Sequence, residues 1–271
     1  MRYSFFYKYK FLQIAVLFLL CFGNANAGPC DITITAALHT TQLDCDDNDI
    51  LSISSNTTKQ FNNDDVVDAQ DTDGVTIVNN GIIQNDGNDF QAPINGTSTR
   101  NLTVTNNGTI NAAKRYGIYI ENAEQVTITN NAGATIRTTY IPGTASAERG
   151  AIYGDKIGNC DDGDCYNSSD SNEGAGLTLH NYGTISSRYR TVAGGIDSNA
   201  AKSRNVKIYN YDGGSITADT TAALKFRDVE DFALYNYSGA TLESGTEDAS
   251  NGDFVVDVAR GHDVVIDNDG T

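Results

Sequence analysis

The sequence predicts an all-β protein, specifically a parallel β-helix, or solenoid, with three short strands in each coil. Three observations carry this prediction: one pattern recurs seven times, apolar and polar residues alternate within each copy, and a further apolar position lies at a nearly constant distance upstream. Most copies begin 24 to 32 residues apart. A unit of that length cannot bury an apolar face alone, so successive units must stack on one another.

The repeated pattern is a pair of apolar residues separated by one position, then Asn two residues on, then Gly, and then Ile or Leu. Its copies begin at Val75, Leu102, Val126, Leu177, Val206, Phe232 and Val264. Position five is always asparagine, namely Asn79, Asn106, Asn130, Asn181, Asn210, Asn236 and Asn268. An asparagine amide both donates and accepts, so the column predicts a structural hydrogen-bonded ladder along the solenoid. The alternative is a role as ligands or as glycan acceptors, in Asn107-Gly-Thr or Asn236-Tyr-Ser.

Alternation within each copy predicts a β-strand with one buried face. Positions one and three are apolar, whereas positions two and four are mostly polar, which is the period of two of a pleated strand. The glycine then permits a bend, and an aliphatic residue begins a second strand. Those aliphatic residues are Ile83, Ile110, Ile136, Ile185, Ile216 and Leu242.

A third strand is predicted upstream of each copy. Eight residues before position one stand Val67, Ile94, Ile118, Leu224 and Val256. In the two remaining coils this position is assigned to Ile196, ten residues before Val206, and to Ile152, which precedes Leu177 by 25 residues. The additional residues between Ile152 and Leu177 predict an inserted loop at 158–174, and the alternative is that they form extra turns of the solenoid. Loops that project from a solenoid flank are frequent sites of binding.

The chain divides into three predicted segments. Residues 1–27 have a basic start, an apolar run from Phe11 to Phe22 and the small-x-small site Ala25-Asn26-Ala27, which is typical of a signal peptide. Residues 28–60 lack the Asn-Gly column and are predicted to cap the solenoid end. Residues 61–271 form the repeats. Export predicts disulfides between Cys30 and Cys45 and between Cys160 and Cys165, because each pair is close in sequence.

The charge balance limits the partners. The chain carries 35 acidic and 18 basic residues, for a formal net charge of −17, and removal of the signal would remove three basic residues. Such a surface repels phosphate backbones and anionic lipids, so we expect neither nucleic-acid binding nor membrane insertion by this segment. We interpret the acidity as a means of keeping a long exposed surface soluble, and the alternative is that it binds calcium or a basic partner.

The run of Asn-x-Gly-x-Ile repeats after a signal peptide resembles the passenger segment of Gram-negative autotransporters and related exported β-helix adhesins. The resemblance covers Val67 to Thr271. It implies a right-handed parallel β-helix, export across the inner membrane, and display at the outer membrane or cell surface, or release as a secreted protein. The chain departs from that family because it lacks a C-terminal translocator barrel and stops at Thr271 in mid-repeat. This departure predicts a fragment or a truncated product.

Catalysis is not predicted, and neither is a cofactor. Arg260-Gly261-His262-Asp263 bears a faint likeness to an element of polysaccharide-cleaving β-helices, but its paired Asp and Arg-x-Lys companions are not visible. The Gly-Asp-Ser-Gly element of serine-protease passengers is absent. His180 occupies an outward strand position, where a solvated side chain is expected. Asp161, Asp162 and Asp164 crowd the inserted loop, and a calcium site there is the alternative to a solvated acidic loop.

Tyrosines form the most distinctive candidate for binding. Tyr182, Tyr211 and Tyr237 follow the ladder asparagine in three successive copies, so they are predicted to stack as an aromatic column, joined by Tyr209 and Tyr235. The column either stiffens the sheet or forms a platform for a sugar or peptide. The sequence therefore predicts a non-catalytic surface-binding or adhesive protein, with the loop at 158–174 presented to a host-surface, cell-surface or matrix ligand. The alternatives are a polysaccharide lyase or hydrolase and a structural stalk.

Overall fold

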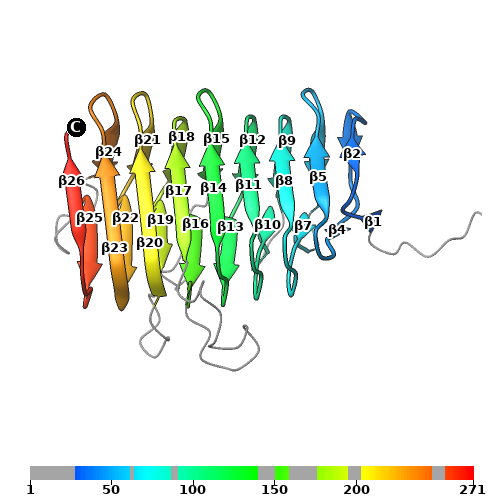
Figure 1. Cartoon of the computed structure of the whole chain (residues 1–271). Helices are drawn as coiled ribbons and strands as arrows, with labels where there is room; N and C mark the ends of the chain where they lie inside the picture. Colours follow the sequence, from blue (N-terminus) through cyan, green and yellow to red (C-terminus); the bar gives the residue numbers. More distant parts are fainter. Residues whose placement is uncertain are drawn as a thin grey trace, which may run out of the picture.

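The chain forms a parallel β-solenoid built from three sheets. The computed structural model describes residues 28–61, 64–86, 91–139, 150–158, 176–194, 203–245 and 254–271. Within those ranges every regular element is a strand, and the strands cycle through the three sheets in turn. Figure 1 shows the coils side by side along one axis, from the blue N-terminal coil to the red C-terminal one.

Sheet A contains β1 (Gly28–Pro29), β4 (Leu43–Asp44), β7 (Val67–Asp68), β10 (Ile94–Asn95), β13 (Tyr116–Glu121), β16 (Gly150–Asp155), β19 (Val192–Gly194), β22 (Leu224–Arg227) and β25 (Val256–Ala259). Sheet B contains β2 (Thr33–Ile34), β5 (Ile50–Ile53), β8 (Thr76–Asn79), β11 (Thr103–Asn106), β14 (Val126–Asn130), β17 (Leu177–Asn181), β20 (Ser203–Asn210), β23 (Val229–Asn236) and β26 (Val265–Asn268). Sheet C contains β3 (Leu38–His39), β6 (Thr58–Gln60), β9 (Ile82–Asn85), β12 (Thr109–Ala112), β15 (Thr135–Thr138), β18 (Thr184–Ser187), β21 (Ser215–Ala218) and β24 (Thr241–Ser244).

The register confirms the predicted columns. Val104 pairs with Ile77 on one side and Ile128 on the other, and Ile110 likewise lies between Ile83 and Ile136. These inward side chains are fully buried and form one continuous core along the solenoid. Each coil therefore buries its apolar residues mainly against the coils before and after it, as a repeat too short to fold alone requires.

One assignment in the third column is wrong. Val192, not Ile196, pairs with Ile152 in β16 and with Leu224 in β22. Val192 precedes Val206 by 14 residues, so the insertion in this coil is longer than predicted; Ile196 lies outside the described residues. The alternative of extra solenoid turns before Leu177 is wrong, because β17 pairs directly with β14.

Residues 28–60 contribute two coils that continue all three sheets. Strands β1 to β6 pair in register with one another and, through β4, β5 and β6, with the coil that follows. In the asparagine column these coils carry Ile34 and Ile53, and Ile53 pairs with Asn79. The division into cap and repeats stays a prediction, and the predicted signal at 1–27 lies outside the described residues.

Candidate ligand-binding face

The asparagine ladder fixes the corner between sheets B and C. The Nδ2 of Asn106 donates to Asn130 Oδ1 at 2.9 Å and to the carbonyl oxygen of Thr135 at 3.1 Å, and the same pair of bonds recurs from coil to coil. The remaining Nδ2-to-Oδ1 bonds join Asn79 to Asn106, Asn130 to Asn181, Asn181 to Asn210, Asn210 to Asn236 and Asn236 to Asn268, at 2.6–2.9 Å. The ladder therefore ties each strand of sheet B to the next coil of sheet C and holds the following residue in a constant position.

Close backbone contact explains the glycine in the copies that read Asn-x-Gly, such as Gly81 and Gly108. A Cβ added at Gly108 would lie 2.0 Å from the carbonyl oxygen of Gly81 in the preceding coil. No side chain fits at that distance, so the turn after the ladder needs glycine for space. With the corner fixed in this way, the outward residues at positions two, four and six of each copy form straight columns.

Position six carries two successive columns of different chemistry. In the N-terminal half it holds a second, exposed asparagine ladder, in which Asn107 Nδ2 donates to Asn80 Oδ1 at 2.9 Å and Asn131 Nδ2 donates to Asn107 Oδ1 at 2.5 Å. In the C-terminal half it holds the three tyrosines of the predicted column. The ring centroids of Tyr182 and Tyr211 lie 4.2 Å apart with the planes inclined by 4°, and those of Tyr211 and Tyr237 lie 5.1 Å apart at 10°.

A parallel column of rings lies beside it at position four. His180, Tyr209 and Tyr235 have successive centroid distances of 5.1 Å and interplanar angles of 13° and 8°. The two columns are linked, because His180 Nδ1 lies 3.1 Å from the hydroxyl oxygen of Tyr211. Together the six rings form a nearly parallel array that extends over β17, β20 and β23.

The stacking determines which part of each ring a ligand can meet. Rings that stack from coil to coil turn their faces along the solenoid axis, so neighbouring rings cover most of those faces. The exposed parts are the ring edges and the hydroxyl groups; Tyr182 and Tyr237 are 37% and 40% exposed. Aromatic edges carry partial positive charge, so they favour oxygen acceptors in a ligand.

Two groups of the array, Tyr211 and His180, have shifted pKa values. Burial and the neighbouring Tyr182 raise the pKa of Tyr211 to about 12, so its hydroxyl stays protonated and can donate a hydrogen bond. Burial lowers the pKa of His180, so its imidazole is uncharged at neutral pH. The array is therefore suited to hydrogen bonding rather than to ion pairing or proton abstraction.

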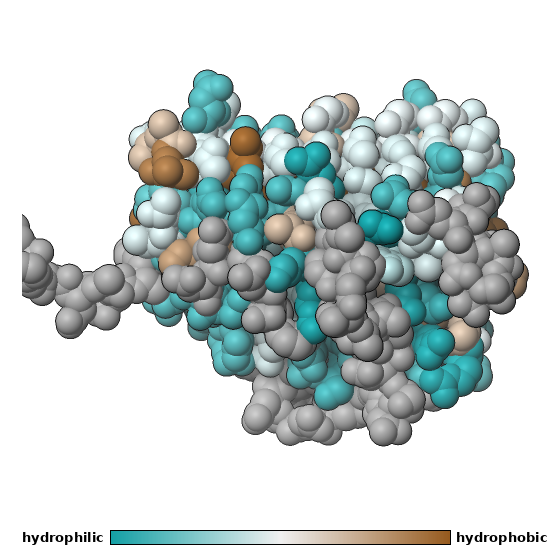
Figure 2. Space-filling model, turned by 180° about the vertical axis from the view of Figure 1, so that it is seen from behind, coloured by the Kyte–Doolittle hydropathy of each residue, from teal (hydrophilic) through white to brown (hydrophobic). Residues whose placement is uncertain are grey.

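We define the sheet B face as the outward residues at positions two, four and six of the six copies that begin at Val75 to Phe232. They are Thr76, Val78, Asn80, Thr103, Thr105, Asn107, Thr127, Thr129, Asn131, Thr178, His180, Tyr182, Lys207, Tyr209, Tyr211, Ala233, Tyr235 and Tyr237. No residue of this set is acidic, whereas the seventh copy carries Asp267 and Asp269 at positions four and six, and Glu230 at the start of β23 pairs with Arg204. Sheet A differs, because its outward column includes Asp44, Asp68 and Asp257. Figure 2 shows the side opposite to that in Figure 1, where hydrophilic residues predominate and hydrophobic ones are scattered.

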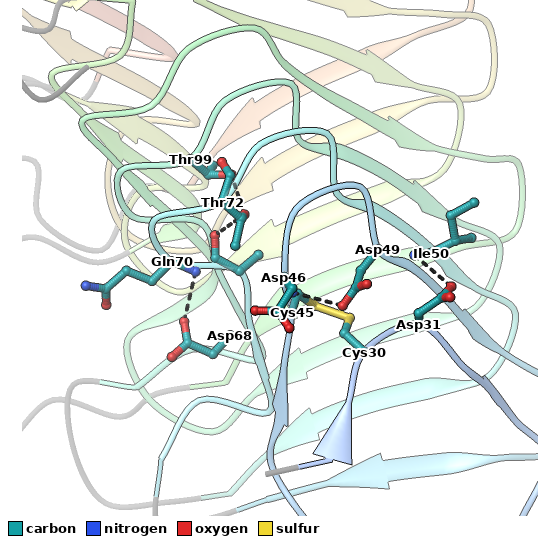
Figure 3. Close-up of a disulfide and its surroundings, with 11 residues drawn as sticks. Cys30, Asp31, Cys45, Asp46, Asp49, Ile50, Asp68, Gln70, Thr72 and Thr99 are labelled. Carbon is teal, nitrogen blue, oxygen red and sulfur yellow. Dashed lines mark hydrogen bonds between the residues drawn. A yellow bond between two sulfur atoms is a disulfide. The ribbon is translucent and has the colours of Figure 1, made fainter. Parts of the chain in front are cut away.

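The cysteines and the other histidines have separate places. Cys30 and Cys45 form a disulfide with a Cα–Cα distance of 4.5 Å, which joins the first two coils of sheet A (Figure 3). A disulfide indicates an oxidising, extracytoplasmic location. Cys160 and Cys165, with nearly all of the predicted loop at 158–174 and its aspartates, lie outside the described residues. His262 lies on a bridge beside Glu230, away from the ring array.

Sequence reasoning overlooked the N-terminal half of the sheet B face. Thr103, Thr105, Thr127 and Thr129 form two rows of hydroxyls in β11 and β14. The row of Thr105 and Thr129 is in line with His180 and Tyr209, whereas the row of Thr103 and Thr127 continues into Thr178 and Lys207. The signal was present in the Thr-x-Thr-Asn-Asn runs of these two copies. The sequence pattern predicted a ladder only for the inward asparagine of each Asn-Asn pair.

The described residues hold no group of three or more His, Cys, Asp or Glu side chains arranged to bind a metal ion. In the part of the chain that the structure covers, no helix is long and apolar enough to cross a membrane. Comparison with protein families, with curated proteins and with solved structures found no match to this chain.

Proposed function

We propose that this chain is an exported, non-catalytic binding protein that uses the sheet B face to attach to a cell-surface or matrix ligand. The observation that carries the proposal is the composition of that face, in which hydroxyls, amides and stacked rings occupy successive coils without one carboxylate. Sheet C is also poor in carboxylates, with Glu243 at an outward position of β24, so it is the stacked rings in line with a row of hydroxyls that distinguish the sheet B face as a ligand surface.

Adhesion fits the arrangement better than catalysis does. The imidazole of His180 and the hydroxyl of Tyr211 are both neutral and hydrogen-bonded, and the face offers neither a carboxylate nor an activated nucleophile beside them. The oxidising location indicated by the Cys30–Cys45 disulfide and the likeness to autotransporter passengers both support display outside the cell. The inserted loop that follows Gly158 remains a further candidate contact.

A matched pair of charge insertions tests the proposal. Thr127 on β14 and Thr135 on β15 belong to the same coil and are both half-buried outward residues, but they lie on sheets B and C respectively. The full chain and each variant are applied to a panel of fixed cells and insoluble polysaccharides, and the bound protein is measured. We expect Thr127→Glu to lose binding and Thr135→Glu to retain it. Equal binding by both variants would exclude the sheet B face, and a loss only on deletion of 159–174 would assign binding to the loop.

A further inference from the structure

We infer that the ligand of the sheet B face is an extended, neutral polysaccharide that lies along the solenoid axis. This inference rests on the proposed function and names the class of ligand. The face repeats along the axis: His180, Tyr209 and Tyr235 follow one another at 5.1 Å, and Tyr182, Tyr211 and Tyr237 follow one another at 4.2 Å and 5.1 Å. A ligand gains a contact from every coil only if its own groups recur at a similar interval.

Polymer geometry separates the classes of ligand. In an extended peptide, residues on one side recur at roughly 6.6 Å, so a peptide laid along this axis falls out of step with the rings within a few coils. Alternate sugars of an extended β-1,4-linked chain are turned over, so like groups on one side recur after two sugars. That distance is close to two coils of the solenoid, so such a chain stays in step with the rings. A repeating ligand would also use the threonine hydroxyls of β11 and β14, among which the row of Thr105 and Thr129 continues the ring column of His180 toward the N-terminus.

The chemistry of the face agrees with hydroxyl-rich ligands rather than with flat apolar ones. Because the ring faces are covered by stacking, a sugar meets ring edges and phenol hydroxyls instead of lying on a ring. The hydroxyl oxygen of Tyr211, which lies 3.1 Å from His180 Nδ1, can still accept a hydrogen bond from a sugar, and the threonine hydroxyls and asparagine amides of the N-terminal half both donate and accept. Sugar hydroxyls, which also donate and accept, can satisfy all of these groups.

Charge favours a neutral polymer over an acidic one. Lys207 is the one formally charged residue of the sheet B face at neutral pH. At the C-terminal end of the sheet B face the ring columns are followed by Asp267, which pairs with Tyr235, and by Asp269. The whole chain has a net charge of −17. A sulfated or carboxylated polymer would be repelled, whereas a neutral polymer incurs no such cost.

Oligosaccharides of increasing length test the inference on the full chain. Neutral cello- and chito-oligosaccharides are titrated by calorimetry, with polygalacturonate and heparin as acidic comparisons. We expect the neutral series to bind, with affinity that rises with each added sugar until the length of the face is filled. We also expect the same affinity at low and high salt, because no ion pair forms.

Three variants connect the binding to the face. Thr127→Glu should weaken binding of the longer neutral oligosaccharides roughly tenfold, because the carboxylate displaces a row of hydrogen bonds, while Thr135→Glu should leave the affinity unchanged. Tyr211→Phe, which keeps the ring and removes the hydroxyl, should weaken binding severalfold without disturbing the stack. Circular dichroism of each variant checks that the solenoid is intact.

The outcomes separate the inference from the proposed function. Binding of acidic polymers alone, or neutral binding that does not increase with length, overturns the inference. If Thr127→Glu abolishes attachment to fixed cells while no neutral oligosaccharide binds, the ligand class is wrong and the binding face stands. If Thr127→Glu affects neither measurement, both the face and its ligand are wrong.

Discussion

Lys59 occupies an inward position of β6, in the column where the following coils carry Ile83 and Ile110. Its side chain is fully buried, and its Nζ has no hydrogen-bond partner within the described residues. His39, its neighbour in β3, is also inward and offers no compensating charge. Burial lowers the pKa of Lys59 from 10.5 to about 8, so at neutral pH the core holds a mostly charged amine that lacks a partner.

Replacement of Lys59 by methionine should stabilise the N-terminal coils. A pKa that falls from 10.5 to about 8 corresponds to ~3.4 kcal/mol of unfavourable free energy for the charged form. Because an ammonium group recruits some water, we discount this to roughly 2 kcal/mol at pH 7. Methionine has a similar length and no charge, so Lys59→Met should raise the free energy of unfolding by about that amount.

The lowered pKa of Lys59 also makes the free energy of unfolding depend on pH. Between about pH 8 and pH 10.5 the unfolded chain keeps the proton that the native amine has released, so stability of the unmodified protein should rise with pH across this window. Lys59→Met should remove this rise. Urea denaturation at pH 7 and pH 10, followed by circular dichroism, measures both effects. Lys207→Met, at an exposed strand position, is the matched control and should change neither. A Lys59→Met variant that is less stable than the parent at pH 7 would show that the amine has a compensating partner.

Three further predictions concern the ladder, the acidic face of sheet A and the disulfide. Asn130→Ala removes the donor to Asn181 Oδ1 and to the Thr184 carbonyl oxygen, and it removes one of the two acceptors of Asn106 Nδ2. We therefore expect a loss of ~2–4 kcal/mol in the free energy of unfolding and faster hydrogen exchange in β14 and β17. Burial, together with Asp68 and Asp64, raises the pKa of Asp65 to about 6, so stability is highest below the ordinary pKa and is lost as pH rises through 6. Protonation of Asp65 between pH 7.5 and pH 5 should stabilise the protein by about 1 kcal/mol, and Asp65→Asn should remove that part of the change measured by urea denaturation, while Asp44 and Asp68, whose pKa values are also raised, keep the remainder. The double substitution of Cys30→Ser and Cys45→Ser should lower the stability of the first two coils by ~3 kcal/mol. Hydrogen exchange would show this as a loss of protection in β1 and β4. Unchanged protection would show that packing alone holds these strands.

The architecture was predictable because one column is chemically uniform. Seven asparagines at one position leave a single way to align the coils, and the aliphatic residues around them then fall into register. The same logic failed at Ile196, since the sheet A column has no such marker and Val192 and Ile196 both precede the copy at Val206. Apolar character alone does not locate a strand beside an insertion of unknown length.

The candidate site was predictable in position but not in orientation. Tyrosines that follow the ladder asparagine must lie in one column, because the ladder fixes the residue before them. The stacking of these rings was therefore predicted, whereas their outward edges and the place of His180 in the stack depend on side-chain rotamers, which are set by packing between coils. Lys59 gave no sequence signal either, because the first two coils lack the asparagine column and their inward positions could not be assigned.

The face that touches the ligand can be identified without any substitution by hydroxyl-radical footprinting. The chain is oxidised free and when bound to a member of the cell and polysaccharide panel that retains it, and the modification of each tyrosine is measured by mass spectrometry. Attachment through the sheet B face predicts strong protection of Tyr182 and Tyr237 and unchanged oxidation of Tyr119 on sheet A. Protection of Tyr119 with unchanged oxidation of Tyr182 and Tyr237 would contradict it.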